Sequence, residues 1–326
     1  MARLGSLVVV ALALAAITPH TSAGGKPQGD IDFGRIVGGT PTSAKQFPWQ
    51  LYVRIGTDGG TYVCGGSIIS QTWAMSAAHC FTDGDPDDDE GFIVTATKIT
   101  LFAGATNKYE VYSDPNVQIN EFVESEFDEY VFINQDYMND AWLNNDITIF
   151  KLKKPLTLTE YVQPIALATP DDFIPGKELT VSGWGRTSPS GSTSSILLYV
   201  AGLFLIPRSE CKSYWGTDSI TDNMICHKTS NKNTCGGDSG GPVITGSGNS
   251  NGPPYVQTGI VSWGSRTCDA YIPKVFVDVA KFRGWIDTTI SKSSCPDRSS
   301  TCPKLAAQGK CKKAKVFNKC KASCAC

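Results

Sequence analysis

Charge and histidine are both scarce in this sequence. Charged residues make up 18% of its 326 residues and the formal net charge is −2, so overall charge gives no reason to expect binding to nucleic acid or to a membrane surface. No internal apolar run reaches the roughly 18 residues that span a bilayer, which argues against an integral membrane protein. The hydrophobic share of 41% is too high for a disordered or fibrous chain. Only three residues are histidine, so few imidazoles are available as a general base.

Glycine, proline and cysteine are plentiful. The 32 glycines and 18 prolines indicate many turns, which are more typical of β-structure than of helical bundles. The twelve cysteines, an even number, are consistent with disulfides formed in an oxidising compartment. Residues 1–23 contain one positive charge, Arg3, then an apolar stretch at 7–17 and the small residues Thr21-Ser22-Ala23. This pattern predicts a signal peptide, and hence a secreted, extracellular protein, rather than a buried helix.

Charge and cysteine spacing divide the remaining chain into two parts. Residues 295–326 carry eight basic residues against one acidic residue, a net charge of +7, and hold six of the twelve cysteines. So short a segment buries too little apolar surface to fold without disulfides. The polar stretch 291–294 marks the boundary, and the other six cysteines are spread over a much larger upstream domain.

The large domain is predicted to consist of strands. Short strands are expected at 50–55, 67–70, 99–103, 147–152, 179–182 and 256–261, between clusters of Gly, Pro, Asn and Asp. Only 279–290 has the pattern of a helix of useful length. Many short strands without alternating helices indicate an antiparallel sandwich or barrel. The acidic stretch 83–90 is predicted to be an exposed, solvated loop, because its spacing matches no calcium loop.

One histidine and one serine are candidates for chemistry. His79 follows the small residues Ser76-Ala77-Ala78, which leave space around an imidazole, whereas His227 lies in a polar stretch and is interpreted as an ordinary surface histidine. Ser239 has four glycines around it in the segment CGGDSGGP, residues 235–242. That composition favours a tight loop whose backbone N–H groups converge beside a hydroxyl. Taken alone, the segment is also compatible with a glycine-rich turn that contains a serine by chance.

Four motifs occur in an order that is typical of one protein family. They are Arg35-Ile36-Val37-Gly38-Gly39, Ala77-Ala78-His79-Cys80, Asn145-Asp146-Ile147 and Gly237-Asp238-Ser239-Gly240-Gly241-Pro242. They resemble the activation site and catalytic motifs of the trypsin/chymotrypsin family of serine proteases, in which His, Asp and Ser follow one another in this order. The resemblance covers residues 36–290. It implies an all-β fold of two six-stranded antiparallel β-barrels, with a catalytic cleft between them and a C-terminal helix.

The resemblance also implies a role for each residue of the site. Ser239 would attack the scissile carbonyl, His79 would take its proton, and Asp146 would hold the imidazole in the required tautomer. The N–H groups of Gly237 and Ser239 would form the oxyanion hole. All three triad residues and both oxyanion positions are present. This argues against the main alternative, a catalytically inactive homologue that acts as a binding protein. No cofactor or metal is expected, because calcium-binding members place glutamates in a loop where this chain has Ala105.

A zymogen is implied as well. Cleavage after Arg35 by another, trypsin-like protease would remove residues 24–35 and free the ammonium of Ile36 to pair with the carboxylate of Asp238. Because loss of one partner of a buried ion pair costs roughly 3–5 kcal/mol, the loop that bears Ser239 should be poorly formed before cleavage. Three disulfides are implied for the protease domain, which is placed at 36–291: Cys64–Cys80, Cys211–Cys226 and Cys235–Cys268.

The specificity pocket departs from that of trypsin. Asn233, followed by Thr234, stands where trypsin-like members have an aspartate, and Lys274 stands where trypsin and chymotrypsin have glycine. Gly264 is a further expected residue of the pocket. An ammonium about 4 Å from a substrate cation would oppose it by roughly 4 kcal/mol at an effective dielectric of 20, which disfavours cleavage after Arg or Lys. Two interpretations stay open: the ammonium selects an acidic side chain, or the aliphatic stem narrows the pocket toward small residues while the charge reaches water. A chymotrypsin-like aromatic preference is a lesser alternative.

The C-terminal cysteines resemble a second, smaller family. Their spacing in 295–326 is similar to that of the ShK-type toxin module, which implies the pairs Cys295–Cys326, Cys302–Cys320 and Cys311–Cys324. Channel-blocking members have a lysine followed by an aromatic residue where this chain has Ala314-Lys315, so a toxin-like channel ligand is the less favoured alternative. The +7 charge would instead dock the protease on an acidic matrix or receptor partner, or form a solvated basic cap. Beyond protein or peptide substrates we expect a monomer, with no nucleic-acid partner and no membrane span.

Overall fold

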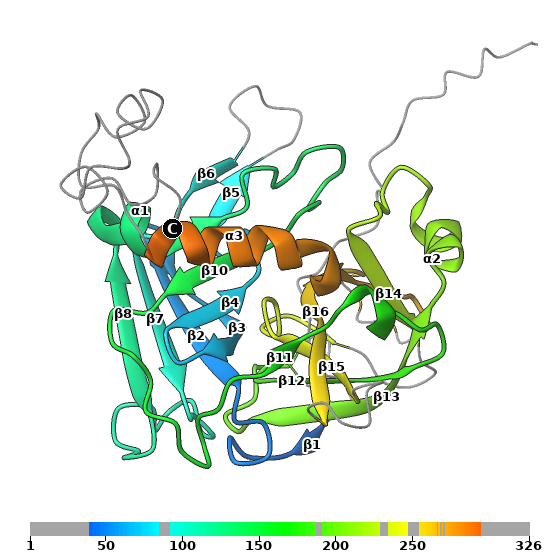
Figure 1. The fold of residues 1–326 in the computed structure, drawn as a ribbon. Helices are drawn as coiled ribbons and strands as arrows, with labels where there is room; N and C mark the ends of the chain where they lie inside the picture. The colour runs from blue at the N-terminus through cyan, green and yellow to red at the C-terminus, as the bar shows by residue number, and fades with distance from the viewer. Residues whose placement is uncertain are drawn as a thin grey trace, which may run out of the picture.

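The structure is a computed structural model that describes residues 39–84, 92–186, 191–228, 234–246, 254–265, 267, 269 and 271–294. The expected signal peptide (1–23), activation segment (24–35) and C-terminal cysteine module (295–326) lie outside these residues. Most strands of the described chain belong to two β-sheets that lie next to each other, with a C-terminal helix packed on both (Figure 1). This arrangement is all-β with two barrel-like sheets, as the resemblance implied.

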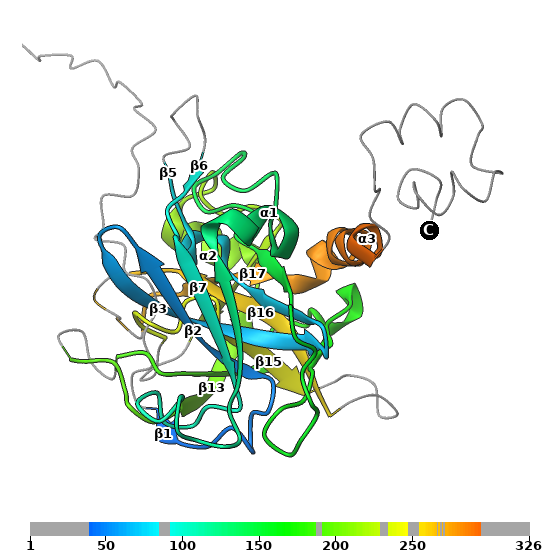
Figure 2. The ribbon, with the colours of Figure 1, turned by 90° about the vertical axis from the view of Figure 1, so that its left-hand side faces the viewer.

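The first sheet has seven strands in the order β8-β7-β2-β3-β4-β10-β9, with antiparallel neighbours throughout. Figure 2 shows β2, β3 and β7 from one side of this sheet. Alternate residues of β2 point into an apolar core, where Val53 and Ile55 are fully buried beside their partners on β7. The strands are β2 (Gln50–Thr57), β3 (Gly60–Ser70), β4 (Trp73–Ser76), β7 (Lys98–Ala103), β8 (Gln118–Val123), β9 (Val131–Ile133) and β10 (Thr148–Lys151).

The second sheet contains a closed ring of strands. Its order is β1-β13-β12-β15-β16-β17-β14, and a further pairing of β13 with β14 closes six of these strands into a barrel. The expected count of six therefore holds for this ring, whereas the first sheet has seven strands and shows no closing pair among the described residues. The strands are β1 (Thr40–Pro41), β11 (Ala166–Leu167), β12 (Glu178–Gly183), β13 (Leu198–Ile206), β14 (Met224–Lys228), β15 (Pro242–Gly246), β16 (Tyr255–Trp263) and β17 (Lys274–Asp278).

Helices are few and short in the described chain. They are η1 (Ala78–Cys80), η2 (Glu124–Glu126), α1 (Phe127–Tyr130), η3 (Pro170–Asp172), α2 (Arg208–Trp215), η4 (Val279–Phe282) and α3 (Arg283–Ser294). The expected helix at 279–290 begins as the 3-10 turn η4 and continues as α3 to Ser294. Helix α2 was not expected from the pattern, because only Cys211 of its eight residues is buried.

The acidic stretch 83–90 is not entirely a loop. Its first residues belong to β5 (Thr82–Gly84), which pairs with β6 (Phe92–Val94) in a two-stranded hairpin. The interpretation of Asp83 as a loop residue was therefore wrong, because a local hairpin supplies backbone partners that composition does not reveal. The remainder of the stretch lies outside the described residues.

The two sheets meet through apolar clusters and a few buried polar contacts. One cluster joins Met75 and Ile149 of the first sheet to Ile260 of the second and to Ile286 of α3. Between the sheets, Ser182 donates a hydrogen bond of 2.6 Å to Gln50 Oε1. This packing fixes the junction at which the candidate residues meet. No helix in the described part of the chain is long and apolar enough to cross a membrane.

Candidate active site

His79 is held in place by the backbone around it. The turn η1 follows directly on β4 and carries His79 at its centre. Ala77 and Ala78 are fully buried, and a disulfide between Cys80 and Cys64 ties the turn to β3. The His79 side chain is only 8% exposed.

Asp146 lies fully buried at the start of the segment that becomes β10. Its Oδ1 accepts a hydrogen bond of 2.8 Å from the backbone N–H of His79, and its Oδ2 lies 2.7 Å from His79 Nδ1. The same Oδ2 accepts a bond of 2.6 Å from the hydroxyl of Ser262. Three donors therefore satisfy a carboxylate whose burial would otherwise be costly. Because an ionised carboxylate only accepts, this contact puts the proton on Nδ1 and leaves Nε2 as the basic nitrogen.

Ser239 lies on a loop whose shape depends on glycine. Gly237 and Gly240 have φ of +102° and +77°, the left-handed region that glycine adopts without strain. A Cβ on Gly240 would overlap Ser76 Oγ and would lie only 3.0 Å from the backbone nitrogen of Ala77. The loop therefore lies directly against the segment that leads into His79.

The loop is also tied by hydrogen bonds to both sheets. Gly65 of β3 donates a bond of 2.7 Å to the carbonyl of Ser239, and Gly240 donates one of 2.8 Å to the carbonyl of Val261 on β16. Because Ser262 is the next residue along β16, one strand connects the loop of Ser239 to the carboxylate of Asp146. The structure thus brings together His79, Asp146 and the Ser239 loop, which are far apart in the sequence.

The hydroxyl of Ser239 is buried and has no hydrogen-bond partner in the described part of the chain. Hydrogen bonds between a nucleophile and its base are often long in a site without substrate and tighten when substrate binds. The backbone N–H groups of Gly237 and Ser239 likewise donate to no other described backbone group outside the strands and helices. The loop therefore carries one hydroxyl and two N–H groups that form no hydrogen bond with described backbone groups outside the strands and helices.

Comparison with known proteins agrees with this geometry. Residues 36–286 match the family model described as Trypsin. The chain is also 32% identical over 287 residues to Trypsin alpha-4 of Lucilia cuprina, a match that covers 87% of this chain and 96% of that relative. The chain belongs to the trypsin family of serine proteases. A protease of this family acts on protein or peptide substrates.

Asp238, the residue before Ser239, is a second fully buried acid in the described part of this trypsin-family domain. Its Oδ1 accepts a bond of 2.8 Å from the backbone N–H of Gly185. Burial raises the pKa of the Asp238 carboxyl to about 8, against the opposing effects of that N–H and of the Lys274 ammonium. Arg35 and Ile36, its expected activation partners, lie outside the described residues.

Two of the expected specificity residues, Lys274 and Gly264, lie directly against each other. Lys274, the first residue of β17, is 1% exposed. Its Nζ donates a bond of 2.8 Å to the carbonyl of Ser265, and a Cβ on Gly264 would overlap its Cδ. Thr234, on the loop side, is fully buried. Asn233 lies outside the described residues.

His227 is a residue whose setting the sequence interpretation missed. It was expected at the surface, but it is 1% exposed and its ring stacks on Phe276, with centroids 4.9 Å apart. The interpretation was wrong because β14 pairs with β13 on one side and β17 on the other, so that His227 lies opposite Leu205 and Lys274. The run Met224–Lys228 begins with two apolar residues, which was the available signal for a buried strand.

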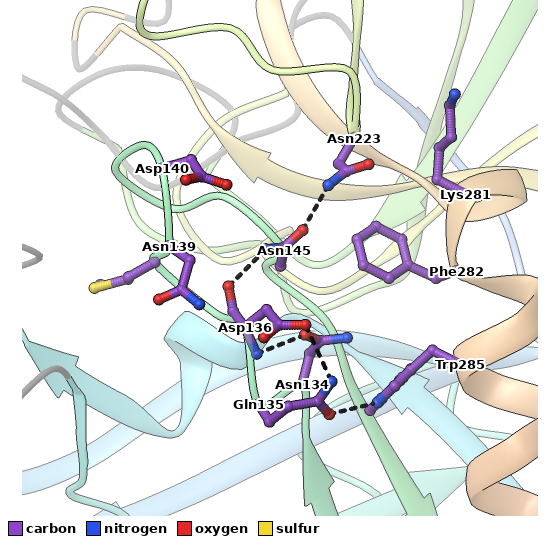
Figure 3. Close-up of a pocket in the computed structure, with 11 residues that line it drawn as sticks. Asn134, Gln135, Asp136, Asn139, Asp140, Asn145, Asn223, Lys281, Phe282 and Trp285 are labelled. Carbon is purple, nitrogen blue, oxygen red and sulfur yellow. Dashed lines mark hydrogen bonds between the residues drawn. The ribbon is translucent and has the colours of Figure 1, made fainter.

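A polar pocket of about 640 Å³ lies behind the loop that carries Asp146 (Figure 3). One of its buried polar residues is Asn145, directly before Asp146 in the chain. The Asn145 amide donates a bond of 2.6 Å to the carbonyl of Asp136, and its Oδ1 accepts one of 2.7 Å from Asn223 (Figure 3). Asn145 has φ of +56°, and three further non-glycine residues of the same loop are also left-handed. This clamp therefore holds a strained turn next to Asp146.

The cysteines of the described domain are in disulfides. Cys64–Cys80 and Cys211–Cys226 have the pairing that the resemblance implied. Cys235 is also disulfide-bonded, while its expected partner Cys268 and all six cysteines of 295–326 lie outside the described residues. Among the described residues, Cys64, His79 and Cys80 form the one cluster with metal-ligand spacing. Because both sulfurs are in a disulfide, neither is available as the thiolate that a metal requires.

Proposed function

We propose that this protein is a serine endopeptidase that uses Ser239 as nucleophile, His79 as general base and Asp146 as the group that orients the base. The observation that carries the proposal is the carboxylate of Asp146, which faces His79 Nδ1 at 2.7 Å in the same junction that holds the Ser239 loop. This arrangement leaves Nε2 of His79 as the basic nitrogen for the serine proton.

The reaction follows from these positions. His79 takes the proton of Ser239 as its oxygen attacks the scissile carbonyl, and the imidazolium that forms is stabilised by Asp146. The N–H groups of Gly237 and Ser239 donate to the oxyanion, each such donor being worth about 3 kcal/mol in related chemistry. His79 then delivers the proton to the leaving amine, and water hydrolyses the acyl-enzyme by the same steps in reverse order.

The test of this function needs a probe that reports on the serine itself. The full chain is cleaved after Arg35 by a trypsin-like protease that is then removed, and a fluorophosphonate probe is added. Covalent labelling of Ser239 and hydrolysis of a mixed peptide library are expected. The Ser239→Ala variant should show neither, and Asp146→Asn should lower kcat by about 10⁴-fold. A cleaved wild-type chain that is neither labelled nor active would favour the inactive-homologue alternative.

We also propose that the protein is made as a secreted zymogen, with a signal peptide at 1–23, an activation segment at 24–35 and the protease domain at 36–291. The buried carboxylate of Asp238 supports this, because burial raises its pKa even against the opposing effect of the Lys274 ammonium. The ammonium of Ile36 would supply that cation after cleavage at Arg35. N-terminal sequencing of the secreted protein, before and after this cleavage, tests both boundaries, and full activity of the uncleaved chain would count against a zymogen.

Primary specificity is proposed to differ from that of trypsin. Asn233 lacks the carboxylate that attracts Arg or Lys in trypsin-like members, and Lys274 adds a positive charge to the pocket wall. Acidic and small side chains are the two preferences compatible with this pocket. Cleavage of a peptide library only after Arg or Lys would overturn the proposal.

The basic segment 295–326 is proposed to be an ShK-like module that docks the protease on an acidic partner through its +7 charge. Salt-dependent binding of the full chain to an anionic matrix such as heparin is expected. The chain truncated after Ser294 should lose that binding and keep its peptidase activity. Current block by the full chain in channel recordings would instead favour the toxin-like alternative.

A further inference from the structure

Lys108 connects the two sheets close to the loop that carries Ser239. It lies between β7 and β8 of the first sheet, and its ammonium donates hydrogen bonds of 3.1 Å to the carbonyl and 2.6 Å to the hydroxyl of Thr193. Thr193 lies in the segment between β12 and β13 of the second sheet. Burial lowers the pKa of the Lys108 ammonium, which is consistent with a side chain that is partly withdrawn from water.

The backbone around Lys108 supports this contact. Residues 106–108 lie antiparallel to residues 195–197, and the two segments are joined by two backbone hydrogen bonds of 2.9 Å and one β-bridge. The Lys108 side chain extends the same contact as far as Thr193. Because the backbone already places Lys108, mainly side-chain entropy is lost when its ammonium binds Thr193.

Thr193 in turn lies against two other segments. It forms an antiparallel bridge with Arg186, and the next residue, Ser194, donates a hydrogen bond of 3.2 Å to the carbonyl of Gly185. Thr193 Cγ2 also lies 3.2 Å from the position that a Cβ on Gly237 would occupy. Thr193 is therefore packed directly against the loop that carries the expected oxyanion donors.

These contacts orient the peptide unit that contains the Gly237 N–H. The carbonyl of Gly236 accepts a hydrogen bond of 3.0 Å from the N–H of Arg186. Because a trans peptide is planar and its C=O and N–H point in opposite directions, this bond also sets the direction of the Gly237 N–H. On the other side of Gly237, the Asp238 carboxylate accepts a bond of 2.8 Å from the N–H of Gly185. Gly237 is thus held on both sides by two adjacent residues of one segment.

We propose that Lys108 is a positioning residue for the oxyanion hole of this protease. This inference rests on the proposed function, in which the N–H of Gly237 binds the oxyanion. By holding Thr193, the Lys108 ammonium keeps the N–H of Arg186 on the carbonyl of Gly236, and the N–H of Gly237 is thereby directed at the reacting carbonyl. Lys108 acts through this series of contacts rather than on the substrate itself.

The test measures turnover and substrate binding separately. The full chain, cleaved after Arg35 and freed of the activating protease, is assayed with the library peptide that it hydrolyses fastest. Lys108→Met keeps most of the stem without the ammonium, and we expect kcat to fall about tenfold while KM changes less than about twofold, because a misdirected oxyanion donor weakens binding of the transition state alone. A kcat equal to that of wild type, or an effect on KM alone, would overturn the proposal.

The pH profile distinguishes an effect on the oxyanion hole from an effect on the base. Displacement of Gly237 leaves the contact between His79 and Asp146 in place, so the pH at which kcat/KM reaches half its maximum should be the same in Lys108→Met and wild type. A shifted profile would show that the substitution acts on His79 instead, and would contradict the proposal.

Further variants assign the effect to the contact between Lys108 and Thr193. Lys108→Arg supplies a charged donor again and should recover most of kcat. Thr193→Val loses the hydroxyl but keeps a methyl group against Gly237, and should lower kcat about threefold. Added to Lys108→Met it should cause no further loss, because both substitutions break the same contact. Losses that multiply in the double variant would refute the role of this contact.

Lys98→Met is the matched control, because it removes an exposed lysine of the same sheet that pairs with Glu121. It should leave both kcat and KM unchanged. A loss of kcat as large as that in Lys108→Met would show that removal of any lysine from this sheet has the effect, and would exclude a specific role for Lys108.

Fluorophosphonate labelling separates the possible failures. Absence of labelling in cleaved wild-type enzyme overturns the proposed function, and this inference with it. A labelled, active wild type whose kcat is unaffected by Lys108→Met overturns only the role of Lys108. If urea unfolding shows that Lys108→Met does not fold, Thr193→Val, which conserves the shape of the side chain, decides in its place, and an unchanged kcat in that variant counts against the proposal.

Discussion

The hydroxyl of Ser262 on β16 donates a hydrogen bond of 2.6 Å to the same oxygen of Asp146 that faces His79 Nδ1. Asp146 lies just before β10 of the first sheet, and Ser262 belongs to β16 of the second. A single carboxylate oxygen therefore connects the segment before β10 to β16 of the other sheet at the candidate active site. The orientation of His79 depends on how the sheets are docked as well as on its own turn.

Removing this contact should slow catalysis without affecting binding. In Ser262→Ala the buried carboxylate loses one of its three donors, and hydrogen bonds to charged groups are worth about 1.5–3 kcal/mol. We expect kcat to fall about tenfold, with KM little changed, in a steady-state assay on the cleaved enzyme. Ser213→Ala, which removes an exposed hydroxyl bonded to the carbonyl of Glu210, should change neither value.

Replacing Asn145 should reveal the strain of its left-handed backbone conformation. Asn145→Ala and Asn145→Gly lose the same two amide hydrogen bonds, but φ of +56° costs alanine about 1 kcal/mol or more and glycine almost nothing. We expect both variants to be less stable than wild type in urea unfolding, with Asn145→Ala the worse by about 1 kcal/mol. Equal free energies of unfolding for the two variants would contradict a strained turn.

The close approach of the two sheets should make Gly240 intolerant of any side chain. A Cβ there would overlap Ser76 Oγ, and φ is +77°. We expect Gly240→Ala to abolish measurable activity and to lower the free energy of unfolding by about 3 kcal/mol, as overpacking of a tight contact does. Gly284→Ala on α3 is a matched control, because no atom lies within 4 Å of its added Cβ. That variant should be stabilised by about 0.5–1 kcal/mol.

Asp238 should make the uncleaved chain less stable as pH rises. Its carboxyl has a pKa of about 8 in the folded chain and about 3.9 when unfolded. Between these values the folded state binds one more proton than the unfolded state, so that the free energy of unfolding falls with increasing pH. The total decrease from pH 4 to 8 is on the order of 5 kcal/mol.

Urea unfolding of the inactive Ser239→Ala variant at pH 5 and pH 7.5 measures this decline without self-digestion. Asp238→Asn in the same background should remove most of it. Cleavage after Arg35 should also remove most of it, because the ammonium of Ile36 would keep the carboxylate ionised. A decline that is the same in all three proteins would show that other groups cause it.

Several strands and two residues of the candidate active site could be predicted from local features of the sequence. Period-two apolar runs such as 50–55 and 99–103 mark strands β2 and β7, because alternate side chains must reach the core. The glycines around Ser239 were informative since two of them adopt backbone conformations that other residues avoid. The scarcity of histidine left His79 as the natural candidate for the base.

Other features depend on neighbours that are distant in the sequence. The hairpin partner of Asp83 is the β6 strand, and the neighbours of His227 on both sides come from β13 and β17. Helix α2 has little apolar pattern and is stabilised by its place beside β14 and by the disulfide Cys211–Cys226. The polar pocket behind Asp146 forms from three segments, of which only one carries a recognised motif.

The sequence by itself determined the chemistry that is available: one serine in a glycine-rich loop, one histidine among small residues, one aspartate before a strand, and a lysine in place of a pocket glycine. Only the tertiary structure decided how these groups act together. Whether the charge of Lys274 reaches water or stays buried depends on Gly264, Ser265 and the strand opposite, which lie beside it only when β14, β16 and β17 are paired. Residue types follow from the chain, whereas burial and solvation follow from contacts that form on folding.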